Sequence, residues 1–442
     1  MSDGTDGPRV GDGGTAGPRV GSGDHPSGGD RGDAAVRSDG GTTGGSADRG
    51  ADRPLSGLTV LELGHIVAGP FCALLLADLG ADVIKVEHPD GGDAIRDSSP
   101  LGNSSFNYVN RDKRSVTVDL KSAEGRAVFA DLAAEADVLV ENFAPGTAER
   151  LGIGYEDLRE DHPELVYCSI KGFNPGPYER YPALDPVAEA LSGVMSVTGH
   201  PGQPPVRCGT SVADMTASFY GAIAVLGALR RRDATGEGGK VTAPLFESTV
   251  ALMGYWLSFA QAYDEVPGPL GASHPNWAPY DVFRAGDGEW VFVGPSSQRQ
   301  WVAMCEALDL DLHRDERFAT LEDRREHVEA LTDLLDDAFG ESDAETLVAR
   351  LRDAGVPVAP VNDAADVAAD PHLAETDALA EVTTAEGRRR TVRVPRFPVR
   401  ASGFERVDSD DPPRLGEHTD EVLSSLGYSA EEIEAMRDRG AV

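Results

Sequence analysis

The chain has 442 residues, of which 75 are Asp or Glu and 40 are Lys or Arg, so its formal net charge is −35. This length allows about two or three domains with a large buried core. The acidic excess repels nucleic-acid phosphates and anionic lipid, and no apolar run approaches the roughly 18 residues that cross a bilayer, so we expect neither nucleic acid nor a membrane as a partner.

Residues 1–53 are predicted to form a disordered tail. The first fifty contain 16 glycines and no aromatic residue, Leu or Ile, so they cannot bury enough apolar surface to offset the entropy of ordering. They also contain no apolar signal segment, which favours a cytoplasmic protein.

A strand–helix–strand unit follows the tail. We predict a buried strand over Leu58–Leu63, a helix over Pro70–Leu79 and a second strand over Ala81–Glu87. Strands joined through a helix run parallel, so this unit predicts a parallel sheet. Further elements follow: a helix over Ala123–Glu135, strands over Asp137–Glu141 and Leu165–Ile170, helices over Pro186–Met195 and Val212–Arg230, a strand over Val241–Ala243 and a helix over Phe246–Phe259.

The pattern of elements changes after residue 260. Pro267–Pro279 is predicted to be a long loop, and Val282–Val293 a hairpin that turns at Gly286–Gly288. Residues 298–353 are mostly amphipathic helix, Val356–Val361 is a strand, and Ala430–Arg439 is a final helix. We therefore divide the chain into a first domain over 54–260, a smaller domain over 275–365 and a segment over 366–442 that returns to the first domain.

Lysine is scarce, since only five of the 40 basic residues are lysines. Excess carboxylate with few lysines is typical of a protein that stays hydrated in concentrated salt, where a Debye length of about 3 Å screens self-repulsion. We interpret the chain as a halophile's protein, the alternative being an acidic mesophile protein.

In this composition the basic run Asn110–Arg114 and Lys121 suggest a site for an anion, although such a run is usually a solvated surface. Lys85 and Lys171, each beside a strand, are expected to be structural.

A glycine-containing turn and two aspartates could carry chemistry. The turn Gly64–Gly69 opens a helix, and the N-terminus of a helix can bind an anion. Glu87 stands where a Rossmann protein binds a ribose, but the turn does not match the GxGxxG motif of dinucleotide-binding proteins. Asp185 and Asp214 each stand at the start of an apolar helix, so each is either a helix cap or, if desolvated, a nucleophile or base. The widely spaced cysteines and histidines predict no metal site and no disulfide.

Several runs are informative together because they follow one another in a fixed order. They are LTVLELGHIVAGPFCALLLADLGADVIKVEHPDGGD, NRDKRSVTVDLKSAEG, DVLVENFAPGTAERLGI, YCSIKGF, LDPVAEALSGVMSVTG, SVADMTASFYGAIAVLGAL, GASHPNWAPYDVF and LGEHTDEVLSSLGYS. Over residues 54–442 they resemble the class III coenzyme A transferases. That family includes formyl-CoA, carnitine and dicarboxylate CoA-transferases, with alpha-methylacyl-CoA racemase as a relative.

The resemblance implies an α/β fold, with a Rossmann-like parallel-sheet large domain and a smaller α/β domain in an interlocked homodimer. It also implies that CoA passes from an acyl-CoA to a free carboxylic acid through a mixed anhydride and an aspartyl-CoA thioester. Asp214 matches the family nucleophile, with Asp185 as a supporting carboxylate; CoA is a substrate carrier, and no permanently bound cofactor is expected. The implied CoA contacts are Val67, Ala68, His88, Val118, Asp119, Leu120, Lys121, Asn142, Phe143, Ala144 and Arg150.

The chain departs from the family pattern at three places. His88 stands where the family often has an arginine that contacts phosphate. The glycine-run loop of formyl-transferring members is replaced by Gly271–His274, which disfavours formyl and oxalyl substrates, although glycine-containing backbone near Gly271 could still supply oxyanion donors. Leu184 replaces the catalytic histidine of the racemase relatives, which favours transfer over racemisation.

Dicarboxylates are the expected acids, with succinyl-CoA and mesaconate as the specific expectation. Arg207 either pairs with the distal carboxylate of such an acid or is a surface ion-pair residue. Two other functions stay open: an alpha-methylacyl-CoA racemase and a nicotinamide oxidoreductase.

Overall fold

The computed structural model describes residues 53–442, except residues 97, 388 and 407. The predicted disordered tail therefore lies outside the described residues, apart from Arg53. Most of the described chain alternates strands and helices, as expected for an α/β protein.

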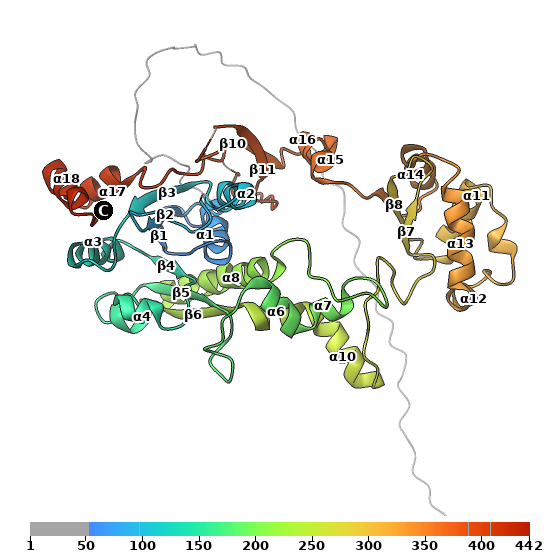
Figure 1. The fold of residues 1–442 in the computed structure, drawn as a ribbon, viewed down its shortest axis with the longest axis horizontal. Helices are drawn as coiled ribbons and strands as arrows, with labels where there is room; N and C mark the ends of the chain where they lie inside the picture. Colours follow the sequence, from blue (N-terminus) through green and yellow to red (C-terminus); the bar gives the residue numbers. More distant parts are fainter. Residues whose placement is uncertain (1–52, 97, 388, 407) are drawn as a thin grey trace, which may run out of the picture. The chain divides into compact units, whose positions relative to one another are not determined.

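Six parallel strands form the main sheet (Figure 1). They are β1 Thr59–Glu62, β2 Asp82–Glu87, β3 Lys113–Thr117, β4 Val138–Glu141, β5 Val166–Lys171 and β6 Gly239–Pro244. Their spatial order is β3-β2-β1-β4-β5-β6, so the direction of winding reverses between β1 and β4. The register places Leu61 of β1 beside Ile84 of β2 and Leu139 of β4, which gives one face a continuous apolar row.

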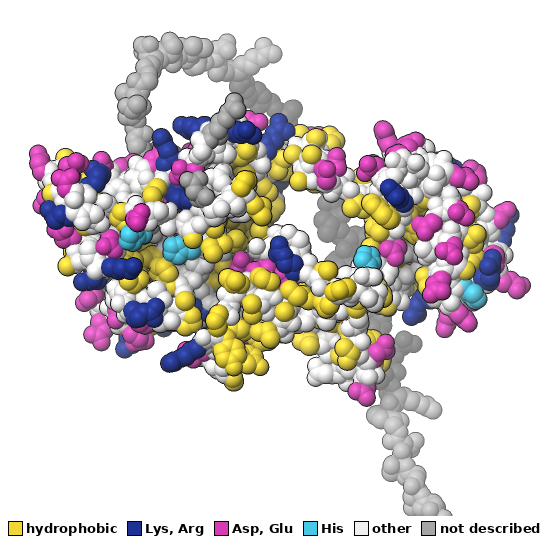
Figure 2. Space-filling model, in the orientation of Figure 1, with side chains coloured by type: hydrophobic (Ala, Val, Ile, Leu, Met, Phe, Trp, Pro, Cys, Tyr) yellow, Lys and Arg dark blue, Asp and Glu magenta, His cyan; other side chains and the backbone are white. Residues whose placement is uncertain are grey.

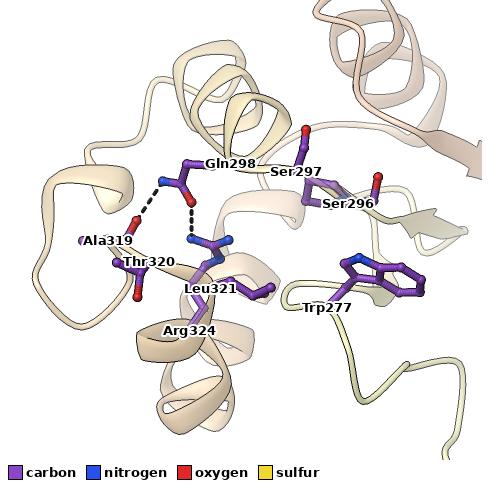
Figure 3. A pocket seen from close by; sticks show the side chains of 9 residues that line it. Trp277, Ser296, Ser297, Gln298, Ala319, Thr320, Leu321 and Arg324 are labelled. Carbon is purple, nitrogen blue, oxygen red and sulfur yellow. Dashed lines mark hydrogen bonds between the residues drawn. The ribbon is translucent and has the colours of Figure 1, made fainter. Parts of the chain in front are cut away.

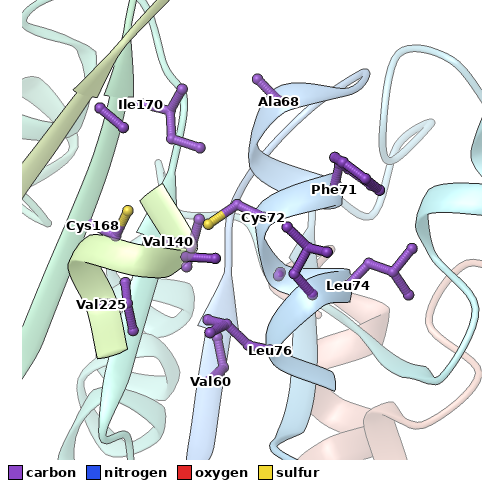
Figure 4. Close-up of a cluster of buried hydrophobic side chains, with 14 of the residues drawn as sticks. Val60, Ala68, Phe71, Cys72, Leu74, Leu76, Val140, Cys168, Ile170 and Val225 are labelled. Carbon is purple, nitrogen blue, oxygen red and sulfur yellow. The ribbon is translucent and has the colours of Figure 1, made fainter. Parts of the chain in front are cut away.

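Helices cover both faces of this sheet because successive strand residues point to opposite sides. The helices between Ala68 and Tyr263 are α1 Ala68–Asp78, α2 Pro100–Val109, α3 Ala123–Ala134, α4 Thr147–Leu151, α5 Tyr155–Leu158, α6 Asp185–Ser192, α7 Val194–Val197, α8 Val212–Thr235, α9 Leu245–Val250, η1 Ala251–Met253 and α10 Gly254–Tyr263. On one face, α1 and α8 pack against Val60, Val140 and Ile170 (Figure 4). On the other, α3 packs against Leu61 and Tyr167.

Residues 281–360 form a second sheet with its own apolar core. Strands β7 Asp281–Arg284, β8 Trp290–Val293 and β9 Val358–Pro360 are antiparallel. The helices of this part are α11 Gln298–Ala307, η2 Leu312–Arg314, α12 Leu321–Glu326, α13 Val328–Phe339 and α14 Ala344–Asp353. Trp301, Phe283 and Phe339 are fully buried in this core, all of whose residues fall within the predicted smaller domain.

The segment after residue 363 ends on the main sheet. Its elements are α15 Ala364–Ala368, α16 Pro371–Glu375, the antiparallel pair β10 Leu379–Thr383 and β11 Thr391–Pro395, α17 Thr419–Ser425 and α18 Ala430–Asp438. Helices α17 and α18 share the core of α3, and the backbone N–H of His418 donates to the carbonyl of Ser115 in β3 at 2.9 Å. The chain therefore returns to the large sheet, as expected.

Several expectations about elements are wrong. Strand β3 is absent from the sequence prediction, because its first residues, Lys113 and Arg114, belong to a run typical of solvated surface. The helix predicted over Pro186–Met195 is divided at Gly193 into α6 and α7, and the helix predicted over Phe246–Phe259 is divided into α9, η1 and α10. One described helix, α8, is long and apolar enough to cross a membrane by length and composition, although no such segment was expected; it packs against α1, β5 and β6.

Candidate functional site

The carboxyl ends of four parallel strands bring most of the predicted CoA contacts to one edge of the sheet. Residues 64–68 follow β1, His88 follows β2, residues 118–121 follow β3, and residues 142–144 follow β4. In open α/β sheets ligands bind outside these strand ends, at the point where the strand order reverses. That point lies between β1 and β4 in this chain.

The turn after β1 is held by partners from both sides of the reversal point. The side-chain oxygen of Asn142 accepts from the N–H of His65 at 2.8 Å, and its amide nitrogen donates to the carbonyl of His65 at 2.9 Å. Ile66 has a left-handed backbone (φ 69°), and its N–H donates to Asp93 at 3.1 Å. These bonds fix a conformation that a β-branched residue rarely adopts. The turn into α1 is therefore held by contacts within the chain itself.

The predicted CoA contacts differ in exposure. Val67, Ala68 and Val118 are buried, so only their backbone can serve a ligand. His88 is exposed, and its Nε2 lies 3.5 Å from a carboxylate oxygen of Asp119, which joins the ends of β2 and β3. The other predicted contacts range from half-buried to exposed; they are Leu120, Lys121, Asn142, Phe143, Ala144 and Arg150. The Arg150 guanidinium donates to Thr147 at 2.7 Å.

The basic run 110–114 is not an anion site. Lys113 is buried, and its ammonium donates to Glu62, to the carbonyl of Pro70 and to Asn110 at 2.8–3.2 Å. Burial lowers the pKa of Lys113 to about 8 against the attraction of Glu62. The guanidiniums of Arg111 and Arg114 pair with carboxylates of α1, β2 and α17. This expectation is wrong because the cations are used inside the protein, which the run alone does not reveal.

Lys85 and Lys171 are structural, as predicted. Lys85 is fully buried and lies 3.1 Å from Glu62 and 3.0 Å from Asp93. It also donates to the carbonyl of Gly64 at 2.9 Å, so the buried ion network supports the turn after β1. Lys171 donates to Glu141 at 2.6 Å and to the carbonyl of Phe143 at 2.7 Å.

Asp214 lies in the first turn of α8, where a helix N-terminus favours a negative charge. Ser218, one turn later, has its hydroxyl oxygen 2.7 Å from the carbonyl oxygens of both Asp214 and Ala68, so α8 begins beside the start of α1. Burial, and secondly the charge of Asp185, raise the pKa of Asp214 to about 7. A carboxyl of this kind loses its proton near neutrality and can then act as a nucleophile.

Asp185 caps α8 rather than its own helix. It is the first residue of α6 and is buried, and its Oδ1 accepts from the N–H groups of Ala213 at 2.8 Å and of Asp214 at 3.2 Å. The capping role expected for Asp185 is therefore correct in kind, but the helix concerned begins 27 residues later. Leu184, just before it, is exposed.

Glu189, which is not among the predicted site residues, completes the acidic group at this site. Glu189 is fully buried on α6, one turn after Asp185, and its Oε2 accepts from the N–H of Cys208 at 2.7 Å. Burial raises the pKa of Glu189, and the neighbouring Asp185 raises it further. The available signal was the spacing of Asp185 and Glu189, four residues apart on an otherwise apolar helix.

The glycine expected to supply an oxyanion donor is already engaged. The N–H of Gly271 donates to the carbonyl of Gly199 at 2.7 Å. Its backbone φ is +65°, and a Cβ there would lie 3.2 Å from the ring of His200. Gly271 therefore joins two loops, and its own N–H is not available to a substrate.

A pocket of about 520 Å³ lies within the second sheet's part of the chain and contains none of the predicted site residues (Figure 3). Trp277 and Gln298 line it together with Arg324, which is buried. The Arg324 guanidinium donates to the carbonyl of Ala278 at 2.6 Å and to Gln298 at 3.1 Å. These bonds serve the local fold, and we assign the pocket no part in the reaction.

Comparisons with known proteins agree on one family. The family model described as CoA-transferase family III matches residues 55–419. An "Acyl-CoA transferase" from Fusarium pseudograminearum is 36% identical over 416 residues, covering 90% of this chain and 89% of that protein. A "Succinyl-CoA:mesaconate CoA-transferase" from Haloarcula hispanica is 37% identical over 387 residues, covering 84% and 96%. The crystal structure of a CAIB/BAIF family protein from Brucella suis has a TM-score of 0.79 and 35% identity, covering 85% of this chain and 100% of that one.

Proposed function

The chain belongs to CoA-transferase family III, and from this membership we propose that it moves CoA between dicarboxylic acids through a covalent intermediate on Asp214. The observation that carries the proposal is the half-buried carboxyl of Asp214 at the start of α8, with a pKa raised to about 7. Ser218 connects this turn to Ala68, which belongs to the proposed CoA site.

The reaction begins when a carboxylate oxygen of Asp214 attacks the thioester carbonyl of the donor acyl-CoA. The carbon–sulfur bond breaks, CoA leaves as a thiolate, and a mixed anhydride remains. The thiolate then attacks the Asp214 carbonyl and displaces the donor acid, which gives an aspartyl-CoA thioester. The incoming acid's carboxylate attacks that thioester and releases the thiolate, and the thiolate attacks the new acyl group. This last step frees the Asp214 carboxylate and the new acyl-CoA.

No proton or water is consumed in this cycle, and water must be kept out because it would hydrolyse either intermediate. A carboxylate suits the task because it can form both an anhydride and a thioester reversibly. We propose that the backbone at Val67–Ala68 and the segments around His88, 118–121, 142–144 and Arg150 hold CoA. The strand-end position of most of these residues supports this.

Succinyl-CoA and mesaconate are the proposed donor and acceptor. The name of the 37% identical relative from Haloarcula hispanica supports this pair. The proposed site of action is the cytoplasm.

Replacing Asp214 tests the proposal. We expect Asp214→Asn to lower exchange between succinyl-CoA and mesaconate by at least about 10³-fold, because an amide is not a nucleophile of this kind. Wild-type protein given succinyl-CoA alone should form a hydroxylamine-sensitive adduct on Asp214, measured by mass spectrometry. Asp233→Asn, at the exposed end of the same helix, is the matched control and should exchange at the wild-type rate. Wild-type exchange by Asp214→Asn would contradict the proposal.

Racemisation of a 2-methylacyl-CoA is the second candidate reaction for this chain. Leu184 has no group that can carry a proton, which favours transfer. Deuterium from solvent entering the α-carbon of a 2-methylacyl-CoA without any acceptor acid, at a rate close to that of transfer, would favour racemisation instead.

We also propose that the protein is a homodimer. Large apolar side chains are exposed on α8 and α10, among them Phe219, Ile223 and Tyr255. Figure 2 shows hydrophobic side chains over the region of α6, α8 and α10, whereas acidic side chains gather over α17, α18 and the helices of residues 298–353. Apolar patches rimmed by polar surface are typical of protein interfaces.

A further inference from the structure

Arg207 lies beside the acidic group of the site with an unused guanidinium. Its Nη1 lies 3.9 Å from Oδ2 of Asp185, which is too far for a hydrogen bond, and its side chain is 52% exposed. Among the residues that the structure describes, none accepts a hydrogen bond from this guanidinium. Its five N–H donors are therefore accessible to a ligand.

The backbone beside Arg207 is bound by an acid of α6, the helix that also supplies the cap of α8. The N–H of Cys208 donates to Glu189, which is fully buried. Asp185, one turn earlier on α6, accepts from the N–H of Asp214. A short series of contacts therefore links Arg207, through Asp185, to the start of α8, where Asp214 stands.

The charges around the acidic group indicate what Arg207 can bind. The site holds three carboxyls, those of Asp185, Glu189 and Asp214, and Arg207 is the one cationic side chain of the described residues within 4 Å of any of them. An acid with one carboxylate brings a single charge, which the reaction itself uses. A dicarboxylate brings a second charge, which the charge of Asp185 would repel unless a cation received it.

We propose that Arg207 binds the far carboxylate of the substrate and so selects dicarboxylic acids over monocarboxylic acids. This inference rests on the proposed transferase function and names the residue that recognises the second carboxylate of the acid. The planar guanidinium can hold a carboxylate through two parallel hydrogen bonds. Its present contact with Asp185 is long and half-exposed, so little stability is lost when a substrate replaces it.

Paired acceptors of equal length test the inference. Exchange from saturating succinyl-CoA is measured with glutarate against valerate and with adipate against caproate, for the wild type, Arg207→Gln and Arg207→Lys. We expect Arg207→Gln to raise the KM for each dicarboxylate by about 10- to 100-fold and to change kcat little, because a charge-assisted pair to the substrate is lost. The monocarboxylates should change less than about twofold, and Arg207→Lys should recover part of the loss.

Arg230→Gln is the matched control, since it removes the same charge from the far end of α8, where Arg230 is exposed. It should keep the wild-type preference. An equal loss for both classes of acid in Arg207→Gln would mean a structural role and would overturn the inference, as would an unchanged preference. Failure of the proposed function is separate: wild-type protein would then form no Asp214 adduct from any acyl-CoA and exchange no acid, whereas failure of this inference alone leaves both intact.

Discussion

The carboxyl of Asp214 is subject to opposing influences within one turn of helix. Burial and the charge of Asp185 favour the protonated form and raise the pKa of Asp214 to about 7, whereas the N-terminus of α8 favours the carboxylate. A protonated carboxyl cannot attack a thioester, and a fully solvated carboxylate is a poor nucleophile. With a pKa of about 7, Asp214 therefore ionises near neutral pH while it is still partly shielded from water.

This balance predicts the pH dependence of the reaction. The ionised form of Asp214 reacts, so kcat/KM for the acyl-CoA should fall by about tenfold for each unit below a pH of about 7. Asp185→Asn should move this acid limb to lower pH, because it removes a charge that raises the pKa of Asp214 while keeping an oxygen that can cap α8. The measurement is kcat/KM against pH for both proteins. An acid limb that is unchanged in Asp185→Asn would contradict the assignment.

The chemistry of Asp214 could be anticipated from sequence only in part. Its place at the start of a long apolar helix can be read from the pattern of residues, and the family resemblance indicates its role. The pKa of Asp214 depends first on burial and secondly on Asp185, which reaches α8 only because α6 packs against it. Such a contact between distant residues leaves no local mark in the sequence.

At the scale of elements, β1 and α1 are joined by an unusually close approach of two glycines. A Cβ on Gly64 would lie 2.8 Å from Cα of Gly69 and 2.6 Å from Oε1 of Glu62. The carbonyl of Gly64 also accepts from Lys85. Strand and helix can therefore meet at this distance only without a side chain at residue 64.

We expect Gly64→Ala to destabilise the protein by about 2–3 kcal/mol, because backbone atoms and a buried carboxylate would have to move. It should also weaken CoA binding, since the turn between the two elements belongs to the proposed CoA site. The measurement is chemical denaturation combined with CoA titration. Gly403→Ala is the control: a Cβ there meets nothing within 4 Å, so a change of less than about 0.5 kcal/mol is expected. Similar free energies of unfolding for the two variants would contradict this reading of Gly64.

Elements of the main sheet differ in how well their residues predict them. Strands β1, β2, β4 and β5 consist largely of buried apolar residues bounded by turns, so their positions are predicted to within one residue or so. Strand β3 begins with Lys113 and Arg114, whose partners, Glu62 and Asp82, lie on other strands. A strand that is stabilised by ion pairs to distant residues has the charged composition of an exposed segment, so its sequence alone does not identify it as a strand.

At the scale of the whole molecule, the net charge of −35 produces repulsion that salt would screen. We propose that the protein is halophilic and expect its unfolding temperature to rise by about 10 °C or more between roughly 0.1 M and 2 M KCl. Calorimetry measures this, with sucrose at equal osmolality as a control for effects that do not depend on charge. Maximum stability at low salt would favour the acidic mesophile alternative.

The proposed dimer predicts a particle with twice the chain mass of 46.7 kDa, measured by light scattering after size exclusion. The double variant Ile223→Glu and Tyr255→Glu should lower this mass, because it places charges among apolar side chains that are 63% and 66% exposed in one chain. Val328→Glu, at an exposed apolar residue of α13, is the matched control and should leave the mass unchanged. A monomer in the wild type would contradict the proposal.

The outer border of β3 is occupied by residues from the far end of the chain. Thr117 donates its N–H to the hydroxyl of Thr419, and the N–H of Asp119 donates to the carbonyl of Ala441 at 2.8 Å. An uncovered border of a sheet is a template for pairing with another molecule. During synthesis this border stays open until residues 416–441 have left the ribosome, some 300 residues after β3 itself. Ribosome stalling or proteolysis before that point would leave a partly folded intermediate with an open sheet border, which chaperones would have to protect from aggregation.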